Sequence, residues 1–109
     1  GKLLLSAIPR SQRTALMQQL RLDRFTANTI TDMDRLEAEL DRCVEQKIGV
    51  DDEEFITGIS CVAVPIYDAD GQILAALAVH APAVRSPLSR SLSLVPRLQR
   101  AAAELANTF

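Results

Sequence analysis

The chain has 109 residues, of which 48% are hydrophobic and 24% are charged, a composition typical of a single soluble domain. Its formal net charge of −2 gives no general attraction to nucleic acid or to an anionic membrane surface. The apolar runs are too short to span a bilayer, and the two cysteines do not suggest a secreted disulfide scaffold. We therefore expect a cytoplasmic protein with reduced thiols and no membrane partner.

The first part of the chain is predicted to be helical. A short helix over residues 2–7 is expected ahead of Pro9, because a residue that precedes proline is disfavoured in a helix. A second helix is predicted over residues 11–20, with Ser11 as its N-cap. Its apolar stripe consists of Leu16, Met17 and Leu20.

A stronger helix is predicted next. Thr31 is the expected N-cap, acidic residues follow in the first turn, and Gly49 is expected to end the helix in a left-handed conformation. The apolar residues recur at helical spacing and form one stripe: Met33, Leu36, Leu40, Cys43 and Val44.

Strands follow the helices. A strand is predicted over residues 50–56 and leads into a β-hairpin over residues 58–81, whose turn contains Asp68–Gly71 as a loop of two or four residues. Either loop puts bulky side chains on one face of the hairpin: Val62, Val64, Ile66, Ile73, Ala75, Leu77 and Val79. The other face carries Cys61, Ala63, Pro65, Ala76, Ala78 and His80.

A final helical segment is predicted after Ser86, which is the expected N-cap before Pro87. Pro96 is expected to kink this segment or to divide it into two helices. Its apolar stripe is Leu88, Leu92, Val95, Leu98, Ala102 and Leu105. The fold class predicted from this order is α+β, an antiparallel sheet flanked by helices. Three strands rarely form a complete sheet, so an unpaired sheet edge is also expected.

The residues Asp51, Cys61 and His80 invite a chemical interpretation. Cys61 and His80 share one face of the hairpin, and with a carboxylate they could form a nucleophilic catalytic set. Alternatively, Cys61 is a small apolar residue and His80 a hydrogen-bonded strand residue. No nucleophile elbow, glycine-rich oxyanion loop or phosphate-binding motif is present, and the single histidine lacks a second ligand at zinc-like spacing. We therefore expect no enzyme activity, no metal and no cofactor.

The acidic run at residues 51–54 is the other polar feature of this region. Alternation along a strand turns about half of its carboxylates toward solvent and the others toward a neighbour or a ligand. Asp51 or Glu53 is thus a candidate polar anchor, and the alternation does not decide between them.

Several of these segments together resemble the IclR-type bacterial transcription regulators. Gly1-Lys2-Leu3-Leu4-Leu5 is similar to the start of their GKALLA-type helix, and Thr29-Ile30-Thr31-Asp32 to their TxTITD segment. The segments Gly49–Phe55 and Gly58–Ile66 resemble the DDEE…G.RCVAAPI signature of the family, and Asp70-Gly71 and Ala75–Val79 complete it. The order and spacing of these motifs cover the whole chain.

The resemblance implies that residues 1–109 form a partial effector-binding domain, a GAF/PAS-like fold incomplete at its N-terminus. DNA would be bound only by a winged helix-turn-helix domain that this chain does not contain. Family members assemble as dimers or tetramers and bind small organic acids. The effector-binding positions that the resemblance implies are Gly1, Asp51, Cys61, Ala78 and His80. Ala78 and His80 correspond to serines in the glyoxylate- and pyruvate-responsive member, a difference that favours a larger, aromatic acid.

The small-residue face of the hairpin then has a functional interpretation. Its alanines and Cys61 leave space for an acid beside His80, with Asp51 as a second polar group. Alternatively, the small residues allow a helix to pack closely against the sheet. A different overall function, a stand-alone GAF/PAS-type sensor without a DNA role, also agrees with these residues.

Overall fold

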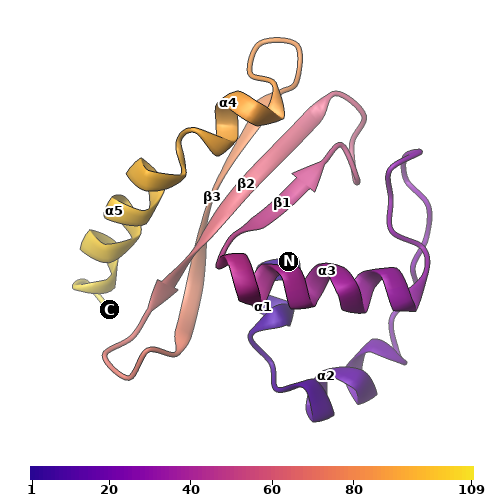
Figure 1. The fold of residues 1–109 in the computed structure, drawn as a ribbon, viewed down its shortest axis with the longest axis horizontal. Coiled ribbons are helices and arrows are strands. Elements are labelled where there is room, and N and C mark those ends of the chain that lie inside the picture. The colour runs from indigo at the N-terminus through magenta and orange to yellow at the C-terminus, as the bar shows by residue number, and fades with distance from the viewer.

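The computed structural model describes all 109 residues and has the predicted α+β architecture (Figure 1). The helices are α1 (Lys2–Ser6), α2 (Arg10–Met17), α3 (Met33–Gln46), α4 (Leu88–Leu92) and α5 (Val95–Ala106). The strands β1 (Gly49–Asp52), β2 (Ile59–Tyr67) and β3 (Ile73–Pro82) form one antiparallel sheet in the order β1-β2-β3. Figure 1 shows α1, α2 and α3 on one side of the strands and α4 and α5 on the other. No helix combines the length and the apolar character that a membrane span requires.

The hairpin has the predicted faces, although its loop differs from the prediction. The connection runs from Asp68 to Gln72, five residues instead of two or four. Asp68 Oδ1 accepts hydrogen bonds from the backbone N–H groups of Asp70 and Gln72, and Gly71 has a φ of +79°. A β-bulge between Ile66 and Tyr67 shifts the pairing by one residue and so restores the expected parity. Cys61 therefore lies opposite His80, and Ala63 opposite Ala78.

The bulky face of the sheet is covered by α5. Val64, Ile66 and Ala102 are buried together, and half-buried residues pack around them: Ile48, Ala75, Leu77, Val95, Leu98 and Ala106. Pro96 stands in the first turn of α5, where its missing N–H costs no helical hydrogen bond, so the C-terminal segment forms two helices. Leu92 and Leu105, which were predicted to belong to the buried stripe, are exposed instead.

A second apolar cluster joins α2 to α3. It contains Met17, Leu36 and Leu40, and Leu40 is fully buried. The buried Arg13 lies beside this cluster, with Nε 3.0 Å from Glu37 Oε1 and Nη2 3.0 Å from Asp41 Oδ1. The predicted stripes were too wide, because Leu16, Leu20 and Val44 are exposed to solvent.

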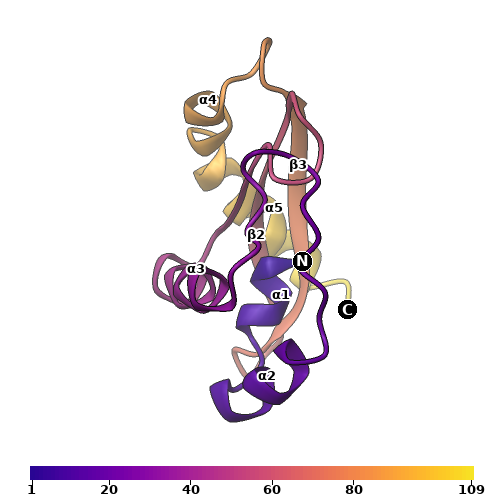
Figure 2. The same cartoon turned by 90° about the vertical axis from the view of Figure 1, so that its right-hand side faces the viewer.

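Helix α1 is the one helix that contacts the small-residue face of the sheet closely. A Cβ atom on Gly49 would lie 3.2 Å from Leu3 Cβ, closer than ordinary van der Waals contact. Gly49 is therefore a strand residue that allows α1 to approach, and it does not end α3 as predicted. Lys47 ends that helix in its place, in the left-handed conformation with a φ of 58°. Figure 2 shows the sheet from the side on which α1 lies.

Three of the predicted N-caps were wrong by one or two residues. Helix α2 begins after Pro9 rather than at Ser11, and Asp32 caps α3 in place of Thr31 by accepting the backbone N–H of Asp34. A carboxylate at that position competes well for the free N–H groups of the first turn. Pro87 precedes α4, and Ser86 Oγ lies 3.2 Å from Ser91 Oγ and does not cap the helix.

Strand β1 is shorter than predicted, and the sheet is unpaired at its edges. Strand β1 ends at Asp52 instead of continuing to residue 56, because Glu53 adopts a left-handed φ of 56° that turns the chain. Strands β1 and β3 each pair with β2 only, so both edges of the sheet are unpaired, in agreement with the unpaired edge expected from the number of strands.

The two apolar residues Leu40 and Val44 of α3 provide a test of this packing. Replacing Leu40 by alanine should lower the free energy of unfolding by about 2–5 kcal/mol, because the side chain is fully buried. The matched change Val44→Ala should lower it by less than about 0.5 kcal/mol, since Val44 is 55% exposed. Urea denaturation followed by circular dichroism measures both values. Equal losses in the two variants would contradict this description of the core.

Candidate functional site

A cavity of about 300 Å³ lies where the start of α1 meets the small-residue face of the sheet. All three strands contribute to it. The five residues singled out from the sequence, Gly1, Asp51, Cys61, Ala78 and His80, all border it. Its remaining wall is mainly apolar and includes Leu3, Ala63 and Ala76. The structure thus brings together, around one cavity, residues that are up to 79 positions apart in the sequence.

Three polar side chains stand in one row across the cavity. Asp51 on β1 lies opposite Cys61 on β2, and Cys61 lies opposite His80 on β3. Cys61 Sγ is 3.7 Å from His80 Nε2, a distance suited to a weak hydrogen bond that involves sulfur. His80 and Ala78 are exposed and Cys61 is half-buried, so this part of the cavity is open to solvent.

The thiol of Cys61 is not poised as a nucleophile. Burial raises its pKa, and the negative charge of Asp51 raises it further. At neutral pH the group is therefore a protonated thiol, whereas nucleophilic attack requires a thiolate. Nor do any three His, Cys, Asp or Glu side chains converge as ligands of a metal ion. The row is better suited to hydrogen bonding than to covalent or metal chemistry.

The acidic run forms a tight turn, and this turn decides between Asp51 and Glu53. Asp51 borders the cavity, and its Oδ1 accepts the backbone N–H of Glu54 at 2.8 Å. The carboxylate of Glu53 instead accepts the backbone N–H of Gly58, with a distance of 2.7 Å to Oε1. Thr26 Oγ1 and Thr29 Oγ1 donate to the carbonyl oxygens of residues 53 and 54 and hold the turn in place. Asp51 is therefore the anchor candidate.

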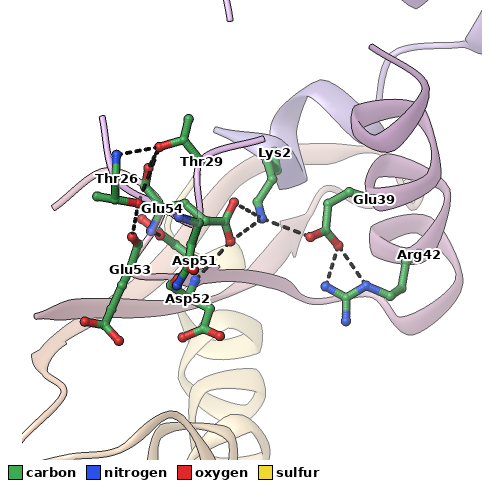
Figure 3. A network of polar contacts seen from close by, with 10 residues as sticks. Lys2, Thr26, Thr29, Glu39, Arg42, Asp51, Asp52, Glu53 and Glu54 are labelled. Atoms are coloured by element: carbon green, nitrogen blue, oxygen red, sulfur yellow. Dashed lines mark hydrogen bonds and ion pairs between the residues drawn. The ribbon is translucent and has the colours of Figure 1, made fainter. Parts of the chain in front are cut away.

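Lys2 also borders the cavity, and sequence reasoning did not identify it as a site residue. Its Nζ lies 2.8 Å from Glu54 Oε1 and 3.2 Å from Glu39 Oε2, and Arg42 binds the other oxygen of Glu39 (Figure 3). The resemblance contains this lysine, but its partners are 37 and 52 positions away, so no local pattern reveals them. The network attaches the start of α1 to α3 and to the acidic turn.

Both interpretations of the small residues describe a part of this face. Helix α1 packs closely against Gly49, as the helix-packing alternative expects. Beyond this contact, Cys61, Ala78 and His80 border the cavity and are not covered by a helix. The imidazole of His80 lies against Cys61 and is not directed away from the cavity.

A larger cavity of about 400 Å³ lies between α5 and the C-terminal end of β2. It is lined by Lys47, Pro65, Tyr67, Gln99, Ala102, Ala103 and Ala106. Binding sites for small molecules usually combine an apolar wall with several convergent polar groups. The cavity at Asp51 and His80 has this combination, with a carboxylate, a thiol and an imidazole in one row.

Comparison with families of known proteins gives a match over nearly the whole chain. The family described as "Bacterial transcriptional regulator IclR C-terminal" matches residues 1–107. Over all 109 residues the chain is 38% identical to the probable transcriptional regulator SauR of Cupriavidus necator and covers 43% of that protein. Over 105 residues, 96% of the chain, it is 33% identical to the HTH-type transcriptional regulator KdgR of Escherichia coli and covers 40% of it. The chain thus spans less than half the length of these relatives.

Solved structures give the same result. The inducer-binding domain of a double mutant of PobR from Acinetobacter, in complex with 3-hydroxybenzoic acid, matches with a TM-score of 0.91 and 30% identity. That match covers 99% of this chain and 62% of the other. The C-terminal domain of Escherichia coli KdgR matches with a TM-score of 0.86 and 32% identity, covering 97% and 65% of the two chains. These relatives are described as transcription regulators and not as enzymes, in agreement with the expectation from the sequence.

The raised pKa of Cys61 predicts slow alkylation. The rate of iodoacetamide labelling of Cys61 should have its midpoint above pH 9.0, the ordinary value for a thiol. Asp51→Asn should move this midpoint to lower pH, because it removes a negative charge beside the thiol. Mass spectrometry of the labelled peptides separates Cys61 from the buried Cys43. Rapid labelling of Cys61 at pH 7 would contradict a protonated thiol.

The Lys2 network predicts a dependence of stability on pH. Burial tends to raise the pKa of Glu39, but hydrogen bonds and charges from Arg42 and Lys2 outweigh it and hold this pKa below the ordinary value of 4.5. Such a group stabilises the folded state above pH 4.5 and loses this contribution as the pH falls through its lowered pKa. Denaturation of Glu39→Gln should therefore show the largest loss at neutral pH, and the difference from wild type should close in acid. A difference that is constant with pH would rule out this contribution.

Proposed function

Because the chain belongs to the IclR family of bacterial transcriptional regulators, we propose that its cavity binds a small organic acid as the effector of such a regulator. The chain is part of the C-terminal, effector-binding domain of the family. One observation carries the proposal: three strands and the start of α1 place Asp51, Cys61 and His80 around one mainly apolar cavity. This combination is the usual design of a small-molecule site, since the apolar wall supplies affinity and the few polar groups supply orientation.

An aromatic acid suits this cavity better than a two- or three-carbon acid. A serine at position 78 or 80 would offer a hydroxyl group close to the floor of the cavity, whereas Ala78 offers only a methyl group. His80 supplies a donor at the end of a longer side chain and can bind a carboxylate placed further from the floor. The structural relative PobR, solved with 3-hydroxybenzoic acid, supports an aromatic acid as the effector.

The remaining steps of the mechanism concern the intact regulator. A homo-oligomer, a dimer or tetramer in the cytoplasm, would carry winged helix-turn-helix domains that lie outside this chain and bind DNA. An acid in the cavity changes DNA binding only if it binds two arrangements of the subunits with unequal affinity. The Lys2 network offers a physical link, because it connects the rim of the cavity to α3 and to the acidic turn.

Titration calorimetry of the intact protein with benzoate, glyoxylate and pyruvate tests the proposal. Benzoate should bind more tightly than either aliphatic acid. His80→Ala should weaken benzoate binding about tenfold or more, since a hydrogen bond to a charged group contributes about 1.5–3 kcal/mol. Leu74→Ala is the matched control: this residue is on the same strand and outside the cavity, so its replacement should leave the affinity unchanged.

Two results would count against this function. Binding restricted to the two- and three-carbon acids would overturn the aromatic preference and leave acid sensing intact. Absence of binding by every acid tested, or electron density for a bound acid elsewhere than between Asp51 and His80, would overturn the assignment of the cavity.

A further inference from the structure

The two polar ends of the cavity are separated by a distance that the sheet fixes. Asp51 and His80 both lie opposite Cys61, on the two strands that flank β2. Neighbouring strands are about 4.8 Å apart, so the backbones of Asp51 and His80 are roughly 10 Å apart. The imidazole of His80 leans toward the middle strand, with Nε2 3.7 Å from Cys61 Sγ, so the polar atoms at the two ends are closer together than the backbones. A ligand that meets both ends must therefore carry one polar group toward β1 and another toward β3.

The two ends differ in charge. At the Asp51 end the cavity is bordered by the carboxylate of Asp51 and by the ammonium group of Lys2, which is already paired with Glu54 and Glu39. The contribution of β3 to the cavity contains no carboxylate: it consists of Ala76, Ala78 and His80. The negative charge of Asp51 repels a ligand carboxylate and offers it no donor, whereas the imidazole of His80 can donate to it.

The Asp51 end requires a hydrogen-bond donor from the ligand. An ionised carboxylate only accepts hydrogen bonds, and the side chain of Asp51 receives one, from the backbone N–H of Glu54 to Oδ1. Oδ2 has no partner within the protein, so it can accept a hydroxyl group of the ligand. An ether or a bare C–H at the same place would leave this oxygen without a partner and displace the water that otherwise binds it.

The middle of the cavity suits a flat ring. Between the two polar ends, the floor is formed by Cys61, Ala63 and Ala78, which are small and protrude little from the sheet. The sulfur of Cys61 can make a favourable contact with an aromatic ring.

We propose that the cavity recognises a hydroxy-substituted aromatic acid in one orientation, with its carboxylate at His80 and its hydroxyl group at Asp51. This inference rests on the proposed function and adds to it the direction in which the acid lies and the need for a donor opposite the carboxylate. Asp51 is then the residue that determines specificity, and His80 binds all aromatic acids alike.

The orientation is tested by measuring the binding of ligand analogues to the wild type and to two single variants, Asp51→Asn and His80→Ala. Calorimetry of the intact protein should show that 3- or 4-hydroxybenzoate binds at least tenfold more tightly than benzoate, and that the corresponding methoxybenzoates lack this advantage. In Asp51→Asn the advantage of the hydroxyl group should fall below threefold. The amide oxygen of the variant can still accept the N–H of Glu54, so the turn should be retained, and thermal unfolding checks this. In His80→Ala both ligands should weaken by the same factor, and the advantage should persist.

The outcomes separate the two proposals. Equal affinities for benzoate and both hydroxybenzoates would overturn the orientation and leave the proposed function standing. Loss of the hydroxyl advantage in His80→Ala, with its retention in Asp51→Asn, would reverse the direction of the ligand and likewise overturn the inference. If neither benzoate nor the hydroxybenzoates nor any aliphatic acid binds, the proposed function itself fails.

Discussion

The register of the three strands is the constraint on which the rest of this molecule depends. Side chains alternate between the faces of a sheet, so a slip of one residue between β2 and β3 would move His80 to the face covered by α5 and bring the bulky residues to the cavity. The bulge at Ile66 and Tyr67 compensates for the odd number of residues in the loop and maintains the register. The burial of Val62, Val64 and Ile66 beneath the helices then secures it energetically, because any slip would expose these side chains.

The acidic turn provides a second level of organisation. Four consecutive carboxylates would repel one another if they all faced the same way, and the structure uses them separately. Asp51 and Glu53 accept backbone N–H groups within the turn and its surroundings, and Glu54 pairs with Lys2. The left-handed conformation of Glu53 is unfavourable by itself, and the hydrogen bonds from Thr26 and Thr29 help to offset it. One wall of the cavity is thus held by bonds that begin in a loop more than 20 residues earlier in the chain.

The sequence predicted those features that depend on local periodicity. The two faces of the hairpin follow from alternation alone, and α3 follows from its spaced leucines, so Cys61 and His80 could be placed together before the structure was known. Helix caps were less predictable, because Thr31 and Asp32 are both good caps; Asp32 accepts the free N–H, while Thr31 Oγ1 accepts a hydrogen bond from Arg24. The function of Gly49 could not be predicted, since a glycine after a helix usually ends it, and only the position of Leu3 shows that it permits close packing. The same holds for Lys2, whose partners are distant in sequence.

Strand β3 has one neighbour only, and this has a consequence for the behaviour of the 109 residues in solution. Its outer backbone groups form a template to which another extended segment can bind. Natural sheets usually protect such an edge with lysine or glutamate gatekeepers, and the ten residues from Ile73 to Pro82 include neither. Because Ala78 and His80 belong to this strand, a segment that capped the edge would also rigidify one wall of the cavity. The tendency to aggregate and the affinity for the ligand therefore both depend on whether the outer backbone amides of β3 are paired.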